Sequence, residues 1–145
     1  MTNNCLRVLE GKVLKKIDLN EDRDKIVFTA EDKQYNFSAW GDCCSKSWIE
    51  SIIGSENIIN QRIIKARLLL MDKYYPDYNY PKNEYYEEYI TTKYKVFGFQ
   101  LVSNQGHCDF IMYNASNGYY SGDLYCDNCE FSHPVYIDTL RCATL

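Results

Sequence analysis

The sequence predicts an α+β fold, in which a mostly antiparallel sheet of about five to seven strands packs against one short helix. Three observations lead to this class. Short runs of β-branched and aromatic residues alternate with polar turn clusters, as strands of an antiparallel sheet do. Fourteen tyrosines and only three prolines among 145 residues favour strands and contact surfaces over linkers. One segment, residues 45–54, has the spacing of a helix.

The first strands are expected within residues 11–40. A partly alternating run, a β-branched run and an aromatic run are separated there by the polar clusters 20–24 and 31–33. In the third run Tyr35 and Phe37 would point to the same face of the sheet. This pattern predicts a β-hairpin or a short meander.

The single helix is expected near residues 45–54. Ser47 and Glu50 fit a capping box, in which the serine caps the helix and the glutamate reaches back. Gly54 stands where a glycine commonly ends a helix. Four apolar residues would form one face of this helix: Trp48, Ile49, Ile52 and Ile53.

The second half of the chain predicts further strands. The stretch that leads to position 71 fits either a helix or a strand, and we favour a strand from Arg62 because β-branched residues open it. Residues 90–102 and 108–114 are apolar runs on either side of the turn 103–106, which predicts a hairpin. We expect one domain over residues 1–145, with a Tyr-rich insertion loop at 74–89 and a Cys-x-x-Cys tail segment at 126–133.

Composition excludes several classes of protein. The net charge of −4 makes nucleic acid an unlikely partner, because binding a phosphate backbone calls for a basic face. The longest apolar run, residues 66–71, is broken by Arg67 and is too short to cross a bilayer, so we expect no membrane association. Seven cysteines without a visible signal peptide indicate reduced thiols in an intracellular protein that is not secreted.

Two motifs resemble those of a known family. Asp42-Cys43-Cys44 before Trp48-Ile49-Glu50 and Gly54 is one, and Ser116-Asn-Gly-Tyr-Tyr120 is the other. In this order they resemble a family of small domains of unknown function found in bacteriophages, some bacteria and some large DNA viruses. The resemblance covers most of residues 8–125. It implies an accessory protein of viral or phage type, located in the host cytoplasm or the virion, and carries over no activity.

A zinc site is the first candidate site. Cys126, Cys129 and His133 have the spacing of one arm of a zinc knuckle. Zinc takes four ligands, and the fourth would come from elsewhere in the chain: His107, Cys108, Cys142 or the Cys43–Cys44 pair. The alternative is a turn with two unligated thiols and a surface histidine. We therefore expect no cofactor if the thiols are unligated, and zinc if these three residues bind a metal.

A thiol nucleophile is the second candidate. Cys43 or Cys44 at the start of the expected helix could have a lowered pKa, because a helix N-terminus stabilises the thiolate. Such a nucleophile also needs a base, and the chain has only His107 and His133. The alternative is that Asp42 caps the helix and one cysteine packs under Trp48. We therefore expect no catalytic residues and no enzyme.

A Tyr-rich contact surface is the third candidate. Half of the chain's tyrosines fall within residues 74–89, namely Tyr74, Tyr75, Tyr78, Tyr80, Tyr85, Tyr86 and Tyr89. Tyrosine offers a large, rigid contact surface with a polar tip. The alternative is a solvated insertion whose rings cover the edge of their own sheet. The function predicted from the sequence is a non-enzymatic interaction protein that binds a virion or host protein. The sequence leaves its oligomeric state open.

Overall fold

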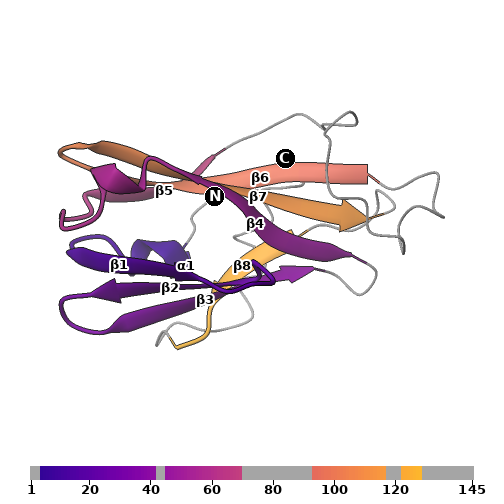
Figure 1. Cartoon of the computed structure of the whole chain (residues 1–145), viewed down its shortest axis with the longest axis horizontal. Coiled ribbons are helices and arrows are strands. Elements are labelled where there is room, and N and C mark those ends of the chain that lie inside the picture. Colours follow the sequence, from indigo (N-terminus) through magenta and orange to yellow (C-terminus); the bar gives the residue numbers. More distant parts are fainter. Residues whose placement is uncertain (1–3, 42–44, 70–92, 117–121, 129–145) are drawn as a thin grey trace.

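The computed structural model describes residues 4–41, 45–69, 93–116 and 122–128, which form a sandwich of two antiparallel sheets (Figure 1). The first sheet has the strand order β1-β2-β3-β8 and the second has the order β4-β7-β6-β5. The α+β prediction and its single sheet of five to seven strands were therefore wrong: the described part is nearly all β, with eight strands in two sheets. The expected antiparallel pairing is confirmed.

The described part has eight strands, and the two longest, β6 and β7, belong to the second sheet. The first sheet contains β1 (Leu14–Leu19), β2 (Lys25–Ala30), β3 (Gln34–Gly41) and β8 (Gly122–Cys126). The second contains β4 (Lys46–Ile53), β5 (Lys65–Leu69), β6 (Lys93–Ser103) and β7 (Gly106–Ser116). The helical turns in the described part are α1 (Asn4–Arg7) and η1 (Ser55–Asn57). Neither of these described helices has the length and apolarity that crossing a membrane requires.

Residues 46–53 form strand β4, so the helix predicted at 45–54 was wrong. A β-bulge between Ile49 and Ser51 inserts one extra residue, Glu50, opposite β7. The bulge places Ile49 and Ile52 on the same, inward side although they are three positions apart. Three is also a helical spacing, which is why the apolar pattern resembled a helix face.

The end signals of the expected helix have other roles in the strand. The indole nitrogen of Trp48 donates a hydrogen bond of 2.8 Å to Glu50, which therefore is no capping-box partner of Ser47. Gly54 adopts a left-handed conformation with φ +92° and leads into η1. Trp48 itself is half-buried and stacks on Tyr113 of β7, with ring centroids 6.1 Å apart.

An aromatic cluster between the sheets forms the centre of the core. Phe28 of the first sheet packs edge-on against Phe99 and Phe110 of the second, at centroid distances of 6.5 and 5.6 Å. Phe99 and Phe110 stack on each other at 4.4 Å. Phe28 also meets Phe37 of its own sheet at 5.7 Å. These rings are almost fully buried, so they hold the two sheets face to face.

The two sheets are also joined along one side by backbone pairing. Val13, just before β1, forms an antiparallel bridge with Arg62, just before β5. Gly11 N–H donates to the carbonyl of Ile63 at 2.7 Å, and Ile63 N–H donates to Lys12 at 2.8 Å. The unpaired sides of β1 and β5 are therefore connected by the residues that lead into them.

Side chains occupy backbone groups at both edges of the second sheet. At β5, a carboxylate oxygen of Glu10 accepts the backbone N–H of Ala66 at 3.0 Å. At β4, the Arg23 guanidinium donates to the carbonyls of Ile49 and Glu50, at 3.2 and 3.3 Å. Because these side chains already occupy backbone groups of the edge strands, they hinder pairing with a strand from another chain.

The meander expected within residues 11–40 and the hairpin at 103–106 are confirmed. Strands β1, β2 and β3 pair in sequence, and Ser103 faces Gly106 at the end of the β6–β7 pair. The strand favoured from Arg62 is also present and begins at Lys65. The Tyr-rich segment 74–89 lies outside the described residues. The described residues share one core, and a single domain over residues 1–145 stays a prediction.

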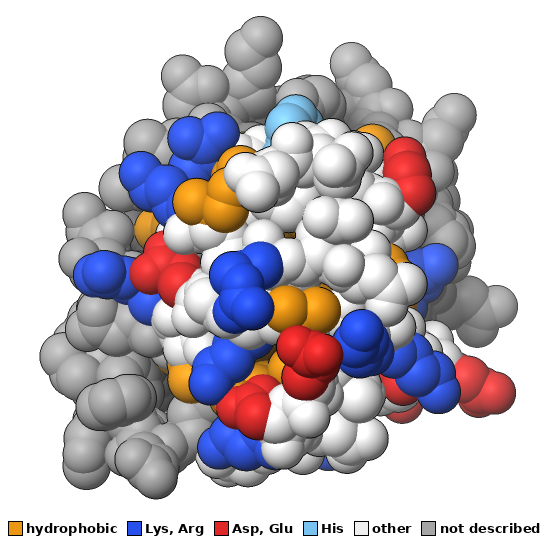
Figure 2. Space-filling model, turned by 90° about the vertical axis from the view of Figure 1, so that its left-hand side faces the viewer, with side chains coloured by type: hydrophobic (Ala, Val, Ile, Leu, Met, Phe, Trp, Pro, Cys, Tyr) orange, Lys and Arg blue, Asp and Glu red, His pale blue; other side chains and the backbone are white. Residues whose placement is uncertain are grey.

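The direction of the strands gathers several turns at one end. Strands β1, β3, β5 and β7 begin there, and β2, β4 and β6 end there. The connections 31–33, 54–64 and 104–105 therefore lie together on the left of Figure 1, the side that faces the viewer in Figure 2. The two exposed large apolar side chains of the described part, Ile53 and Ile64, belong to this end.

Gly98 of β6 is expected to tolerate no side chain. A Cβ atom at this position would collide with the carbonyl oxygen of Phe110 on the neighbouring strand. Gly98→Ala should therefore lower the free energy of unfolding by about 1–3 kcal/mol, as overpacking does. Chemical denaturation of this variant measures the loss. Ser51→Ala, a half-buried position of β4, should change stability by less than about 0.5 kcal/mol; equal stability of the two variants would contradict the packing.

Candidate functional site

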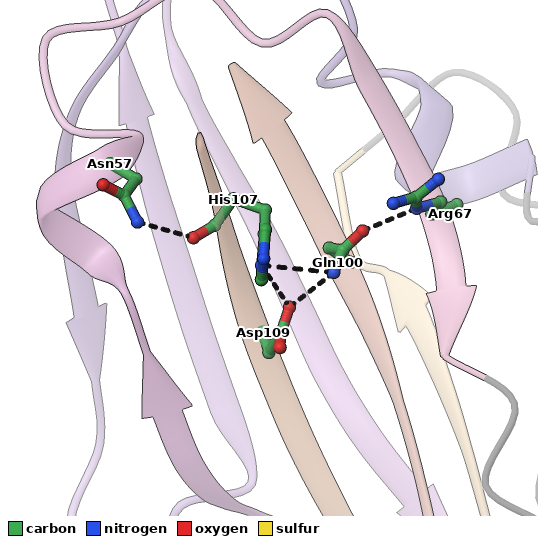
Figure 3. A network of polar contacts seen from close by, with 5 residues as sticks. All are labelled: Asn57, Arg67, Gln100, His107 and Asp109. Atoms are coloured by element: carbon green, nitrogen blue, oxygen red, sulfur yellow. Dashed lines mark hydrogen bonds and ion pairs between the residues drawn. The ribbon is translucent and has the colours of Figure 1, made fainter. Parts of the chain in front are cut away.

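A row of polar side chains crosses the outer face of the second sheet, close to the turn 104–105 (Figure 3). Arg67 of β5 lies opposite Gln100 of β6, and Gln100 lies opposite Asp109 of β7. Because side chains alternate along a strand, burial of Phe99 and Phe110 in the core sends this row to the opposite face. Strands β5, β6 and β7 thus each contribute one polar side chain to a line across this face.

Short hydrogen bonds connect the row. The Arg67 Nε donates to Gln100 Oε1 at 2.5 Å, and Gln100 Nε2 donates to Asp109 Oδ1 at 2.7 Å. His107, two residues before Asp109 on the same strand, has its Nδ1 atom 2.9 Å from Asp109 Oδ1. The same Nδ1 lies 3.2 Å from Gln100 Nε2. We call Arg67, Gln100, His107 and Asp109 the polar row.

The donors and acceptors of the polar row allow one arrangement. Arginine only donates, so the amide oxygen of Gln100 faces Arg67 and its amide nitrogen faces Asp109. The Asp109 carboxylate only accepts, so the Nδ1 atom 2.9 Å from it must carry a proton. A neutral His107 ring therefore has its lone pair on Nε2. A carboxylate behind the opposite nitrogen is also how proteins orient metal-binding and catalytic histidines.

Burial makes the polar row rigid on one side and accessible on the other. Gln100 is only 6% exposed, so both of its hydrogen bonds are shielded from water. The side chain of His107 is 55% exposed and that of Asp109 is 25% exposed. The row thus holds His107 in a fixed orientation at the protein surface. Its Nε2 atom can accept a hydrogen bond from a partner or bind a metal.

The start of β7 is held in place by the turn η1. The Asn57 amide nitrogen donates to the backbone carbonyl of His107 at 2.9 Å (Figure 3). The Ser103 hydroxyl in turn donates to the carbonyl of Asn57. Gly106, with φ +136°, lets the hairpin pass close to the Asn57 side chain. These contacts fix the backbone that carries His107.

His107 and the neighbouring thiol do not form a nucleophile and its base. Cys108 points into the core and is fully buried, whereas His107 points outward from the same strand. Burial, together with the negative charges of Asp109 and Glu56, raises the pKa of the Cys108 thiol to about 12. This thiol therefore stays protonated, and it is also a poor candidate for the fourth zinc ligand.

The described part of the zinc candidate is one residue, Cys126, and it is buried in β8 and disulfide-bonded. A disulfide sulfur is not the thiolate that zinc binds, so the structure differs at this residue from the reduced thiols expected from the sequence. Cys129 and His133 lie outside the described residues. Within the described ranges, no group of three or more His, Cys, Asp and Glu side chains could hold a metal. Zinc binding stays a prediction.

The two other sequence candidates also lie outside the described residues. For Cys43 and Cys44, the helix that was to lower their pKa does not exist, because residues 46–53 form β4. The physical reason for a reactive thiol there is therefore lost. The tyrosines of residues 74–89 stay a predicted contact surface.

The polar row was not predicted from the sequence. His107 was predicted only as the fourth zinc ligand or as the base for a thiol nucleophile. A signal was present, because His107 and Asp109 flank one residue of an expected strand and so share a face. Arg67 and Gln100 could not be added, since the pairing register of three strands is needed to bring them together.

A second polar cluster lies at the same end of the sandwich. Lys12 and Tyr35 both donate to one carboxylate oxygen of Asp32, at 2.8 and 2.7 Å. The hydrogen bonds from Lys12 and then Tyr35 lower the pKa of Asp32 to about 2, and the bond to Asp32 raises the pKa of Lys12. This cluster ties the β2–β3 turn to the segment before β1.

Residues 8–126 match the model of a family described as a domain of unknown function, DUF7448. The chain belongs to this family. The match spans all eight strands, so the whole sandwich lies within the family's domain. It agrees with the resemblance to a family of unknown function over residues 8–125. Comparisons with curated proteins and with solved structures give no match.

Neutral His107 is expected to carry its proton on Nδ1. Long-range ¹H–¹⁵N NMR of the imidazole nitrogens should show this tautomer, with His133 as an internal reference because the chain has two histidines. Asp109→Ala removes the acceptor and leaves Gln100 to donate to Nδ1, so His107 should change to the Nε2–H tautomer. An Nε2–H tautomer in the unsubstituted protein would contradict the arrangement.

Asp32 is expected to stabilise the fold above about pH 4. Its pKa is about 2 in the folded protein and 3.8 ordinarily, so the folded state binds the proton less readily than the unfolded state. The stability it contributes is present above 3.8 and is lost as the pH falls toward 2. The unfolding free energies of the unsubstituted protein and Asp32→Asn should therefore converge over this range.

The matched control for Asp32 is Asp22→Asn, in the exposed β1–β2 turn. Added salt should reduce the effect at Asp32, because this carboxylate is at the surface and its ion pair is screened. A difference between Asp32→Asn and the unsubstituted protein that stays constant from pH 5 to 2 would contradict the role of the ion pair.

Proposed function

We propose that this protein is a non-enzymatic interaction protein of viral or phage type, which docks into an assembly or blocks a host factor by binding a protein. The family carries no assigned function, and the resemblance in its motifs supports the viral or phage source. The observation that carries the proposal is an exposed surface whose side chains are already fixed, at the end of the second sheet.

This surface combines apolar anchors with an oriented polar group. Ile53 and Ile64 are 59% and 53% exposed, although isoleucine is usually buried. Ile53 ends β4 directly opposite Asp109 of the polar row. Because Gln100 and Asp109 already hold His107, binding a partner here orders few further side chains.

The blocked edges favour a face or an end as the contact region. Glu10 and Arg23 occupy backbone groups at β5 and β4, so adding a foreign strand would displace them. Apolar side chains and fixed polar groups on a face need no such displacement. The partner is therefore proposed to contact the outer face and the turn end rather than extend the sheet.

The Tyr-rich segment is proposed as a second part of the same recognition. It places seven of the chain's fourteen tyrosines in residues 74–89. So many rings exceed what the core of a small domain can bury, and tyrosine is common at the centre of protein interfaces. This segment joins β5 to β6, two strands that contribute to the polar row.

Replacing Tyr78, Tyr80, Tyr85 and Tyr86 by Ser should weaken partner binding at least tenfold, or about 1.4 kcal/mol, with little change in thermal stability. The measurement is affinity capture from the native source followed by titration of the captured partner. The same four positions changed to Phe keep the rings and are the matched control. A variant that unfolds while the Phe form stays folded would show that the rings pack inward.

A second arm of the experiment addresses the described surface. The double variant Ile53→Ser and Ile64→Ser removes the exposed anchors without emptying the core, because both side chains are more than half exposed. Loss of the partner in this arm assigns the contact to the turn end. Undiminished capture in both arms would contradict the proposed function.

A further inference from the structure

We infer that the turn end of the sandwich binds an extended acidic peptide segment, through Lys33, Arg62, Lys65 and Arg67. This inference rests on the proposed function and names the chemistry of its partner. The surface concerned, here called the basic end, comprises residues 10–15, 31–34, 53–67 and 102–107. Figure 2 views this end directly and shows several Lys and Arg side chains on it, with Asp and Glu side chains between them.

The basic end is positive although the whole chain is negative. It contains six Lys and Arg residues, Lys12, Lys15, Lys33, Arg62, Lys65 and Arg67. It contains four acidic residues, Glu10, Glu31, Asp32 and Glu56. The chain as a whole has a net charge of −4, so positive charge is concentrated here and negative charge elsewhere. Such an asymmetry attracts acidic partners and orients them before contact.

Three of the four acidic residues are already paired. The ion pairs are Lys12–Asp32 at 2.8 Å, Lys15–Glu31 at 4.0 Å and Arg7–Glu10 at 3.3 Å. Asp109 lies just beyond this end and accepts from Gln100 and contacts His107. Glu56 and Asp109 are thus the acidic groups that remain to balance the four other cations, which outnumber them.

Four cations have no acidic partner among the described residues. Arg62 donates to the backbone carbonyl of Gly11 at 2.5 Å, and Arg67 donates to the Gln100 amide oxygen. Both acceptors are neutral, so they orient the guanidinium groups without cancelling their charge. Lys33 lies over the Tyr35 ring at 5.0 Å, which also leaves its charge intact. Lys65 is exposed on β5.

The geometry of these cations suits carboxylates on an extended chain. Lys65 and Arg67 are two positions apart on β5, and both are exposed. Their Cα atoms are therefore about 7 Å apart, the repeat of alternate residues in any extended peptide. A guanidinium fixed through one nitrogen keeps further N–H groups that can bind a carboxylate in bidentate form.

The apolar neighbours favour a peptide over a nucleic acid. Ile64, directly before Lys65, and Ile53 offer exposed apolar contacts for a side chain between the carboxylates. The basic end contains no Phe, Tyr or Trp on which a base could stack. The negative net charge also opposes a long polyanion, whereas a short acidic segment contacts only the basic end.

The test uses the full chain and a fluorescein-labelled peptide of sequence Gly-Glu-Leu-Glu-Leu-Glu-Gly, with binding followed by anisotropy at low and at physiological salt. Lys65→Ala with Arg67→Ala should weaken binding at least tenfold, and salt should weaken binding to the unsubstituted protein. The matched control, Lys16→Ala with Lys25→Ala on the first sheet, removes the same charge and should change affinity less than twofold.

Arg67 also orients Gln100, so Lys33→Ala with Lys65→Ala serves as a second variant that leaves the polar row intact. It should likewise weaken binding, and thermal melting confirms that both variants are folded. Three outcomes would each overturn the inference. The unsubstituted protein binds a control peptide with Gln in place of Glu as tightly as the acidic peptide, or it binds a ten-residue oligothymidylate equally tightly or more tightly. The third outcome is that the control variant Lys16→Ala/Lys25→Ala loses as much affinity as the test variants.

Capture of the native partner separates this inference from the proposed function. If the partner binds the unsubstituted protein and the Lys65→Ala/Arg67→Ala variant equally, the basic end is not its acidic-segment site, and the proposed function stands. If no partner is captured by the unsubstituted protein, the proposed function itself fails. Loss of capture in the variant together with loss of the acidic peptide supports both.

Discussion

The contact of Phe28 with Phe99 and Phe110 is the interaction on which the rest of the molecule depends. It joins the two sheets at the centre of the core, and it fixes which positions of β6 and β7 face inward. Once Phe99 and Phe110 are inside, Gln100 and Asp109 must be outside. The polar row is therefore a consequence of the core: shifting either strand by one residue would bury these polar groups and expose the rings.

The polar row gives the outer face of the second sheet a side chain of fixed orientation. His107 is oriented by hydrogen bonds that lead through Asp109 and Gln100 to Arg67 on a third strand. The guanidinium of Arg67 thereby contributes in two ways, since one nitrogen orders the row and the charge remains available at the basic end. Burial of Gln100 makes this order costly to break, because a lost hydrogen bond would leave a desolvated amide.

How far the sequence predicts this structure depends on whether the local pattern is regular. The meander at residues 11–40 alternates and is flanked by polar turns, so its strands follow from the sequence. In β4, the extra residue Glu50 breaks the alternation and puts Ile49 and Ile52 on one side, a spacing that strands with bulges share with helices. Whether this segment becomes a helix or a bulged strand depends on β7, which pairs with β4 but lies more than fifty positions away in the sequence.

The candidate site likewise contains some residues that the local sequence pattern predicts together and others that only the tertiary structure brings together. His107 and Asp109 are close in sequence, and a strand alone brings them to one face. Their connection to Gln100 and Arg67 depends on strand pairing, and the concentration of charge at the basic end depends on how turns from both sheets meet. Residues that act together only through tertiary structure leave no pattern in a single sequence.

The Val13–Arg62 bridge has a consequence for how the chain folds. Its two residues are 49 positions apart, and Phe37 of β3 pairs with Cys126 of β8 across a still longer stretch. Closing such large loops lowers chain entropy before the contacts stabilise the fold, so formation of this sandwich belongs to the slow range of roughly milliseconds to seconds. Until the bridge closes, β1 and β5 lack the neighbour that joins them, and the newly made chain is then most open to aggregation.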